Sequence, residues 1–190
     1  MTPSNVSGIE RAKLAIDHLL GAVVAALMAA LVLDVLWQVF TRFVMRNPSS
    51  FTDELARYLL VWVGLLGAAY CAGQRLHLAI DLFPSRLTGR PRHLVEIAIQ
   101  SAILVFAVAV MVVGGARLVG LTLLLGQTSA ALQLPLGAVY TVLPLSGVLI
   151  AFYAVVFILE HVRALRDGEP LPEPVLSDIP HDVSTTTAYE

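Results

Sequence analysis

Charged side chains are scarce in this sequence. Asp, Glu, Lys and Arg make up 14% of the 190 residues, whereas hydrophobic residues make up 57%. A typical soluble domain has about 25% charged and about 45–50% apolar residues. The sequence therefore predicts a membrane-embedded protein. Its net charge of −2 excludes the strongly basic surface of an ordinary nucleic-acid binder.

Cysteines and catalytic motifs are also nearly absent. The single cysteine, Cys71, excludes an internal disulfide framework and a zinc site built from cysteines. The sequence contains no phosphate-binding loop, HExxH zinc motif or nucleophile–base motif. We therefore expect no enzyme activity, no catalytic residues and no bound metal or cofactor.

Long apolar runs predict four transmembrane helices. A bilayer core of about 30 Å needs about 20 helical residues to cross it. Twenty uncharged residues lie between Glu96 and Arg117, and 42 lie between Arg117 and Glu160. The longer run contains the polar stretch 126–129 and Pro135, which predict a turn between two helices. The fold class is therefore all-α integral membrane, with predicted spans at residues 15–43, 55–76, 93–125 and 136–162.

The two ends of the chain differ from this membrane domain. Residues 1–14 are expected to precede the four-helix domain of residues 15–166, and the first span is too long for a usual cleaved signal peptide. Residues 167–190 carry six acidic side chains, four prolines and no Lys or Arg. This composition is typical of a solvated, disordered tail.

The placement of Lys and Arg predicts the orientation of the spans. The flanks and loop on one side of a four-span protein hold eight basic residues, and the opposite side holds four, at Arg42, Arg46, Arg57 and Arg117. Because basic residues are enriched on the cytoplasmic side of a membrane protein, both termini are predicted to be cytoplasmic.

Within the spans, small residues and two charges stand out. Small residues recur at four-residue spacing, a pattern that lets helix backbones approach closely in lipid. They are Gly21, Ala25 and Ala29, then Gly64, Ala68 and Ala72, then Gly147 and Ala151. Asp34 and Arg117 are the charges expected inside spans, at similar depth on the non-cytoplasmic side. We expect a structural role, in which they pair or face a polar partner, more than ion coupling.

The start of the second span carries a compact charged motif. Ser49, Ser50 or Thr52 can cap this helix, and acidic residues in its first turn suit the positive end of the helix dipole. Asp53 and Glu54 lie four and three residues before Arg57, so both acids can reach the same guanidinium.

This region resembles the small membrane subunit of tripartite ATP-independent periplasmic (TRAP) transporters, the DctQ-like family. The resemblance covers roughly residues 20–165 and is most specific between Arg42 and Asp81. One departure is Phe51, which stands where the family commonly has a tryptophan before the acidic pair, so the indole N–H donor is lost. The matching residues are Phe40 and Arg42, Asp53–Arg57, Trp62 with Gly67 and Ala68, and Arg75, His77, Ile80 and Asp81.

The resemblance implies a scaffold subunit of the bacterial inner membrane. It implies binding to a large membrane subunit that carries substrate and sodium. It also implies a soluble periplasmic protein that delivers the substrate, typically an organic acid. The structural and subunit-interface candidates that follow from it are Arg42, Asp53, Glu54, Arg57, Trp62, Gly64, Gly67, Arg75, His77 and Asp81.

Two other classes of protein remain as alternatives. A four-helix haem or electron-transfer subunit would use histidines at the ends of the spans as axial ligands, and the candidates are His18, His77, His93 and His161. A small stand-alone channel or carrier would transport a solute without a second membrane subunit.

The predicted orientation has a direct test. A reporter that is active only in the cytoplasm, fused after Glu190, is expected to be active because the basic flanks keep that end inside the cell. Reporter assays on whole cells measure this, and an inactive fusion that is present in the membrane would reverse the orientation.

Overall fold

The computed structural model describes residues 8–46, 50–74 and 90–167, most of which are helical. Ser49 and most of the tail predicted at 167–190 lie outside these ranges. In chain order the helices are α1 (Gly8–Phe43), α2 (Ser50–Gly73), α4 (Arg90–Phe106), the π-helix η2 (Ala107–Gly114), α5 (Gly115–Leu124), α6 (Leu136–Tyr140) and α7 (Val142–Asp167).

The four predicted spans are confirmed. Within the described residues, four helical segments are long and apolar enough to cross a membrane: Lys13–Phe43, Phe51–Gly73, Pro91–Leu124 and Leu136–Arg166. The third segment is continuous through α4, η2 and α5. The second begins four residues before its predicted start, so the acidic motif lies inside its first turns.

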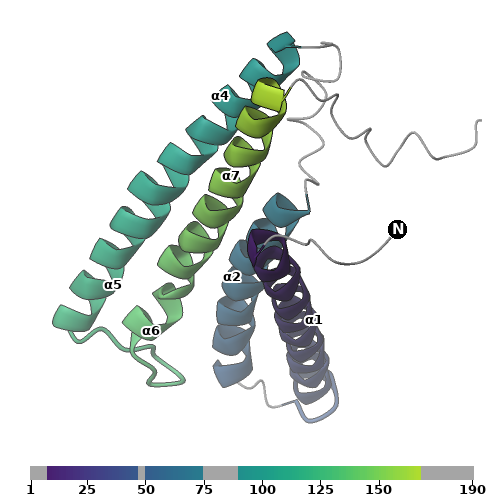
Figure 1. The fold of residues 1–190 in the computed structure, drawn as a ribbon. Coiled ribbons are helices and arrows are strands. Elements are labelled where there is room, and N and C mark those ends of the chain that lie inside the picture. The colour runs from purple at the N-terminus through teal and green to yellow at the C-terminus, as the bar shows by residue number, and fades with distance from the viewer. Residues whose placement is uncertain (1–7, 47–49, 75–89, 168–190) are drawn as a thin grey trace, which may run out of the picture.

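Helix α7 lies in the middle of the domain (Figure 1). It packs on α2 along one side and on α4 and η2 along the other, while α1 packs along α2. Helices α1 and α5 therefore lie at opposite edges of the domain.

The core forms where α1, α2 and α7 meet. Tyr153 and Val142 of α7 are almost fully buried, and Leu20 of α1 and Leu66 of α2 pack in the same cluster. The Tyr153 hydroxyl also donates a hydrogen bond to the Asp17 carboxylate, which links α7 directly to α1. Apolar burial and one polar contact therefore fix the same helices.

A π-helical segment lies within the third span. Residues Ala107–Gly114 form η2 between α4 and α5, and no proline or polar residue in this stretch signals the change. The segment faces α7 at Gly147, where an added Cβ would lie 2.6 Å from the Met111 Cβ and 3.2 Å from the Ala107 carbonyl oxygen. Gly147 is therefore required for this close contact, as the small-residue pattern of the fourth span predicts.

Pro144 does not break the fourth span at its middle. It is the third residue of α7, where a missing backbone N–H removes no intrahelical hydrogen bond. The interruption lies earlier, between α6 and α7 at Thr141. Pro144 instead packs against α5, where a Cβ on Gly115 would lie 3.0 Å from the Pro144 Cδ.

The contact at Gly147 predicts a steric effect. Gly147→Ala is expected to lower the stability of the folded chain by about 1–3 kcal/mol, because the added methyl group overpacks the contact with η2. Thermal unfolding in detergent would measure it. Gly64→Ala is the matched control, because a Cβ at Gly64 meets nothing within 4 Å and alanine is the better helix former. Equal melting temperatures for Gly147→Ala and the unmodified chain would contradict the described packing.

Candidate functional site

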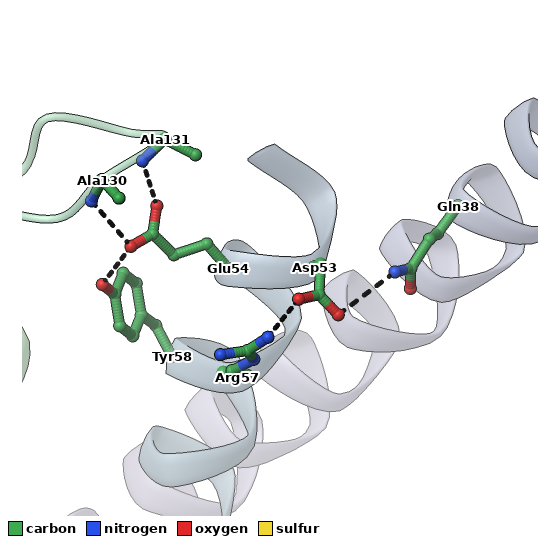
Figure 2. Close-up of polar contacts among 7 residues, drawn as sticks. All are labelled: Gln38, Asp53, Glu54, Arg57, Tyr58, Ala130 and Ala131. Atoms are coloured by element: carbon green, nitrogen blue, oxygen red, sulfur yellow. Dashed lines mark hydrogen bonds and ion pairs between the residues drawn. The ribbon is translucent and has the colours of Figure 1, made fainter. Parts of the chain in front are cut away.

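The Glu54 carboxylate is the centre of the polar contacts at the start of α2 (Figure 2). One of its oxygens accepts hydrogen bonds from the Tyr58 hydroxyl at 2.7 Å and the Ala130 N–H at 3.2 Å. The other oxygen accepts from the N–H groups of Ala131 at 2.8 Å and Leu132 at 3.0 Å. Glu54 thus joins α2 to the α5–α6 connection, residues 125–135.

The α5–α6 connection is folded so that it can receive this carboxylate. Thr128 and Pro135 form an isolated antiparallel bridge. The Ser129 N–H donates to the Leu134 carbonyl at 2.8 Å. Gln133 has a positive φ of 54°, which turns the chain within this small loop. The loop presents three consecutive N–H groups to one anion, and successive backbone N–H groups are a recurrent means of binding negative charge.

Asp53 makes a different set of contacts from its neighbour. Its carboxylate forms an ion pair with Arg57 and accepts a hydrogen bond from the Gln38 side chain of α1 at 3.4 Å. The Arg57 and Asp53 side chains are 73% and 52% exposed, and exposed ion pairs contribute only about 0–1 kcal/mol to stability. Of the two acidic residues at this end of α2, Glu54 is the less exposed.

The prediction that both acids share Arg57 is wrong for Glu54. The carboxylate of Glu54 is directed toward Tyr58 and the connection, away from Arg57 (Figure 2). Adjacent residues on a helix point about 100° apart, so the two acids meet different neighbours. The Arg57 guanidinium would be an exposed partner for Glu54. The α5–α6 connection instead offers three N–H groups, which would lack an acceptor without the Glu54 carboxylate.

The remaining candidates on α2 divide into inward and outward residues. The Trp62 indole N–H donates to the Val139 carbonyl of α6 at 3.0 Å, so this side chain holds α2 to the start of the fourth span. Gly64 and Gly67 face open space, because an added Cβ would meet no atom within 4 Å at either position. Arg42 is exposed in the last turn of α1. The candidates Arg75, His77 and Asp81 lie outside the described residues.

Asp34 and Arg117 do not pair with each other, which corrects one of the two roles expected for them. Asp34 is on α1 and Arg117 is exposed on α5, at the opposite edge of the domain. Similar depth in the membrane was the reason to expect pairing, but depth carries no information about lateral position. One carboxylate oxygen of Asp34 is buried and has no hydrogen-bond partner among the described residues.

The opposite end of the domain holds contacts that the sequence analysis missed. The Lys13 ammonium lies 4.7 Å from the centre of the Phe157 ring, a cation–π contact between α1 and α7. The buried rings of His93 and His161 meet edge to face, with centroids 5.7 Å apart. This contact joins α4 to α7. Among the residues the structure describes, no group of three or more His, Cys, Asp or Glu side chains is placed to hold a metal ion.

Tyr58 is the residue near the site that sequence reasoning overlooked. It lies four residues after Glu54, which places both side chains on the same face of α2, so the spacing could have indicated it. The three N–H groups of the connection had no comparable signal, because they lie 76 to 78 residues away in the chain.

Removal of the Glu54 charge is expected to loosen the α5–α6 connection. In Glu54→Gln the amide keeps the size of the side chain but replaces one acceptor oxygen with a donor, so at least one loop N–H loses its acceptor. Hydrogen exchange at Ala130, Ala131 and Leu132 is expected to become faster, and amide exchange followed by mass spectrometry measures it. Asp53→Asn is the matched control and is expected to leave exchange there unchanged. Unchanged protection in Glu54→Gln would show that the carboxylate does not hold the connection.

Comparison with known proteins agrees with the sequence pattern. The family model described as "Tripartite ATP-independent periplasmic transporters, DctQ component" matches residues 31–164. This range includes α2 and the α5–α6 connection, which together make the Glu54 contacts.

Two curated relatives match about half of the chain. The sialic acid TRAP transporter small permease protein SiaQ of Vibrio cholerae serotype O1 is 31% identical over 99 residues, which are 52% of this chain and 57% of that protein. The isethionate TRAP transporter permease protein DctMQ of Oleidesulfovibrio alaskensis is 32% identical over 101 residues, 53% of this chain and 16% of that longer protein.

The chain thus matches less than two thirds of the length of either relative, while the family match covers most of the chain itself. This protein therefore belongs to the family of DctQ components of tripartite ATP-independent periplasmic transporters.

Proposed function

We propose that this chain is the small permease subunit of a sodium-coupled TRAP transporter that takes up an organic acid across the bacterial inner membrane. Family membership and the two relatives support the role of a small permease subunit. In this proposal the chain is a scaffold that binds the large membrane subunit and helps to dock the periplasmic substrate-binding protein.

The observation that supports the scaffold role is the set of hydrogen bonds between the Glu54 carboxylate and the α5–α6 connection. The end of α1, the start of α2 and the α5–α6 connection lie at the same end of the domain (Figure 1), and the Glu54 carboxylate holds this connection to α2. A surface built from loops becomes suitable for docking when its backbone is fixed, because less conformational freedom is lost on binding.

The predicted orientation assigns this end to the periplasm. Arg42, Arg46, Asp53 and Arg57 are exposed there, so charged groups of both signs are available to a soluble partner. Charged groups at the rim of an interface mainly set its specificity and association rate. We therefore assign the contact with the substrate-binding protein to this end of the domain.

We propose that the large membrane subunit contacts the outer face of α2, where some of the candidates named from sequence lie. Gly64 and Gly67 leave this face open, and small residues allow close helix packing in lipid. Trp62 and Glu54 act within the chain and are positioning residues for this face. Arg75, His77 and Asp81 remain predicted to fix the end of the second span.

Recovery of the complex from native membranes tests the proposal. The tagged chain, extracted in mild detergent, is expected to co-purify with a much larger hydrophobic membrane protein, which mass spectrometry of the eluate identifies. The chain alone, in liposomes with an inward sodium gradient, is expected to give no uptake of radiolabelled sialic acid or succinate.

Recovery of the tagged chain without a larger membrane partner would contradict the scaffold role. Uptake by the chain alone would favour the stand-alone carrier. A haem absorbance band in the purified protein would favour the electron-transfer alternative, with His93 and His161 as the first residues to replace.

A further inference from the structure

Arg117 points away from the rest of the domain. Gly115 and Thr122 of the same helix are buried, and Gly115 packs against Pro144 of α7. Successive helical residues are about 100° apart, so Arg117, two residues after Gly115 and five before Thr122, lies on nearly the opposite side of α5. It is exposed, at the outer edge of the domain.

This arginine has apolar surroundings on its own helix and no partner for its charge among the described residues. Val113 is 60% exposed, Leu121 48% and Leu124 85%, and these residues share its face at helical spacing. Arg117 lies seven residues before the last residue of α5, or about 10 Å along the helix axis. Within the described residues no ion pair or hydrogen bond involves its side chain. A cation that faces lipid inside a span is costly, and such residues usually face protein or water.

Two glycines beside Arg117 leave space for another helix. A Cβ at Gly120 would meet no atom within 4 Å, and the nearest atom to one at Gly114 is the Ala109 carbonyl oxygen, at 3.9 Å. Neither glycine is therefore needed for packing within the described chain, although glycine is unfavourable inside a helix. Small residues on both sides of an arginine let a second helix approach closely enough for a carboxylate to reach the guanidinium.

We propose that a transmembrane helix of the large membrane subunit packs on this surface of α5 (Gly114, Arg117, Gly120, Leu121 and Leu124) and supplies a carboxylate to Arg117. This inference rests on the proposed function. The length of the DctMQ relative supports the choice of occupant, since the region similar to this chain is 16% of it. A DctQ-like region therefore occurs covalently joined to a much longer protein. The contact is separate from the outer face of α2 and lies at the edge of the domain that α5 forms.

Arg117→Leu separates this proposal from a lipid-facing arginine. Leucine suits the lipid environment, so the variant is expected to reach the membrane at least as well as the unmodified chain. Its recovery of the large subunit is expected to fall roughly tenfold or more, because the partner's carboxylate would be left buried and unpaired. Quantitative co-purification with the co-expressed large subunit measures this. Arg163→Leu, an exposed arginine at the end of α7, is the matched control and is expected to behave as the unmodified chain.

A second measurement does not depend on removal of the charge. A photo-crosslinking amino acid at Leu121 or Leu124 is expected to join the otherwise unmodified chain to the large subunit. Undiminished co-purification of Arg117→Leu, or crosslinks from both positions to lipid alone, would overturn the assignment and leave the proposed function standing. Failure of the unmodified chain to recover the large subunit would instead contradict the proposed function and this contact with it.

Discussion

The contact between Glu54 and three backbone N–H groups fixes the end of the domain on which the proposed docking role depends. The α5–α6 connection joins the third and fourth spans, and α2 belongs to the other pair of spans. The carboxylate therefore links the two halves of the chain. The Trp62 indole makes a second link nearby, to the start of the fourth span. Together they hold α2 and the loop end of the domain in one arrangement.

Inside the membrane the domain depends on close steric contact around α7. Lipid removes most of the hydrophobic driving force between helices, so the contacts must come from shape and from a few polar groups. Gly147 allows η2 to pack closely, and Tyr153 combines burial with a hydrogen bond to Asp17. The outer faces of α2 and α5 lack comparable contacts within the described chain. Their open glycines are consistent with a subunit that works in a larger assembly.

The spans and the family could be inferred from sequence because both depend on local properties. Length, hydropathy and the motif from Asp53 to Arg57 can be seen without knowledge of which helices touch. Local sequence properties could not show whether Asp34 pairs with Arg117, because the order of the helices along the chain does not determine which helices are neighbours in the membrane. The partners of Glu54 were missed for a related reason, because its carboxylate accepts hydrogen bonds from backbone N–H groups more than 70 residues away in the chain. The π-helical turn at 107–114 has no compositional signal at all.

The most direct test of the scaffold account is an experimental structure of this chain bound to its large membrane subunit in lipid. The account predicts that the Glu54 carboxylate lies within hydrogen-bond distance of the Ala131 and Leu132 N–H groups in that complex. It also predicts that the end of the domain formed by this contact is open to the periplasm. An α5–α6 connection detached from α2, with Glu54 paired to Arg57 instead, would contradict the account.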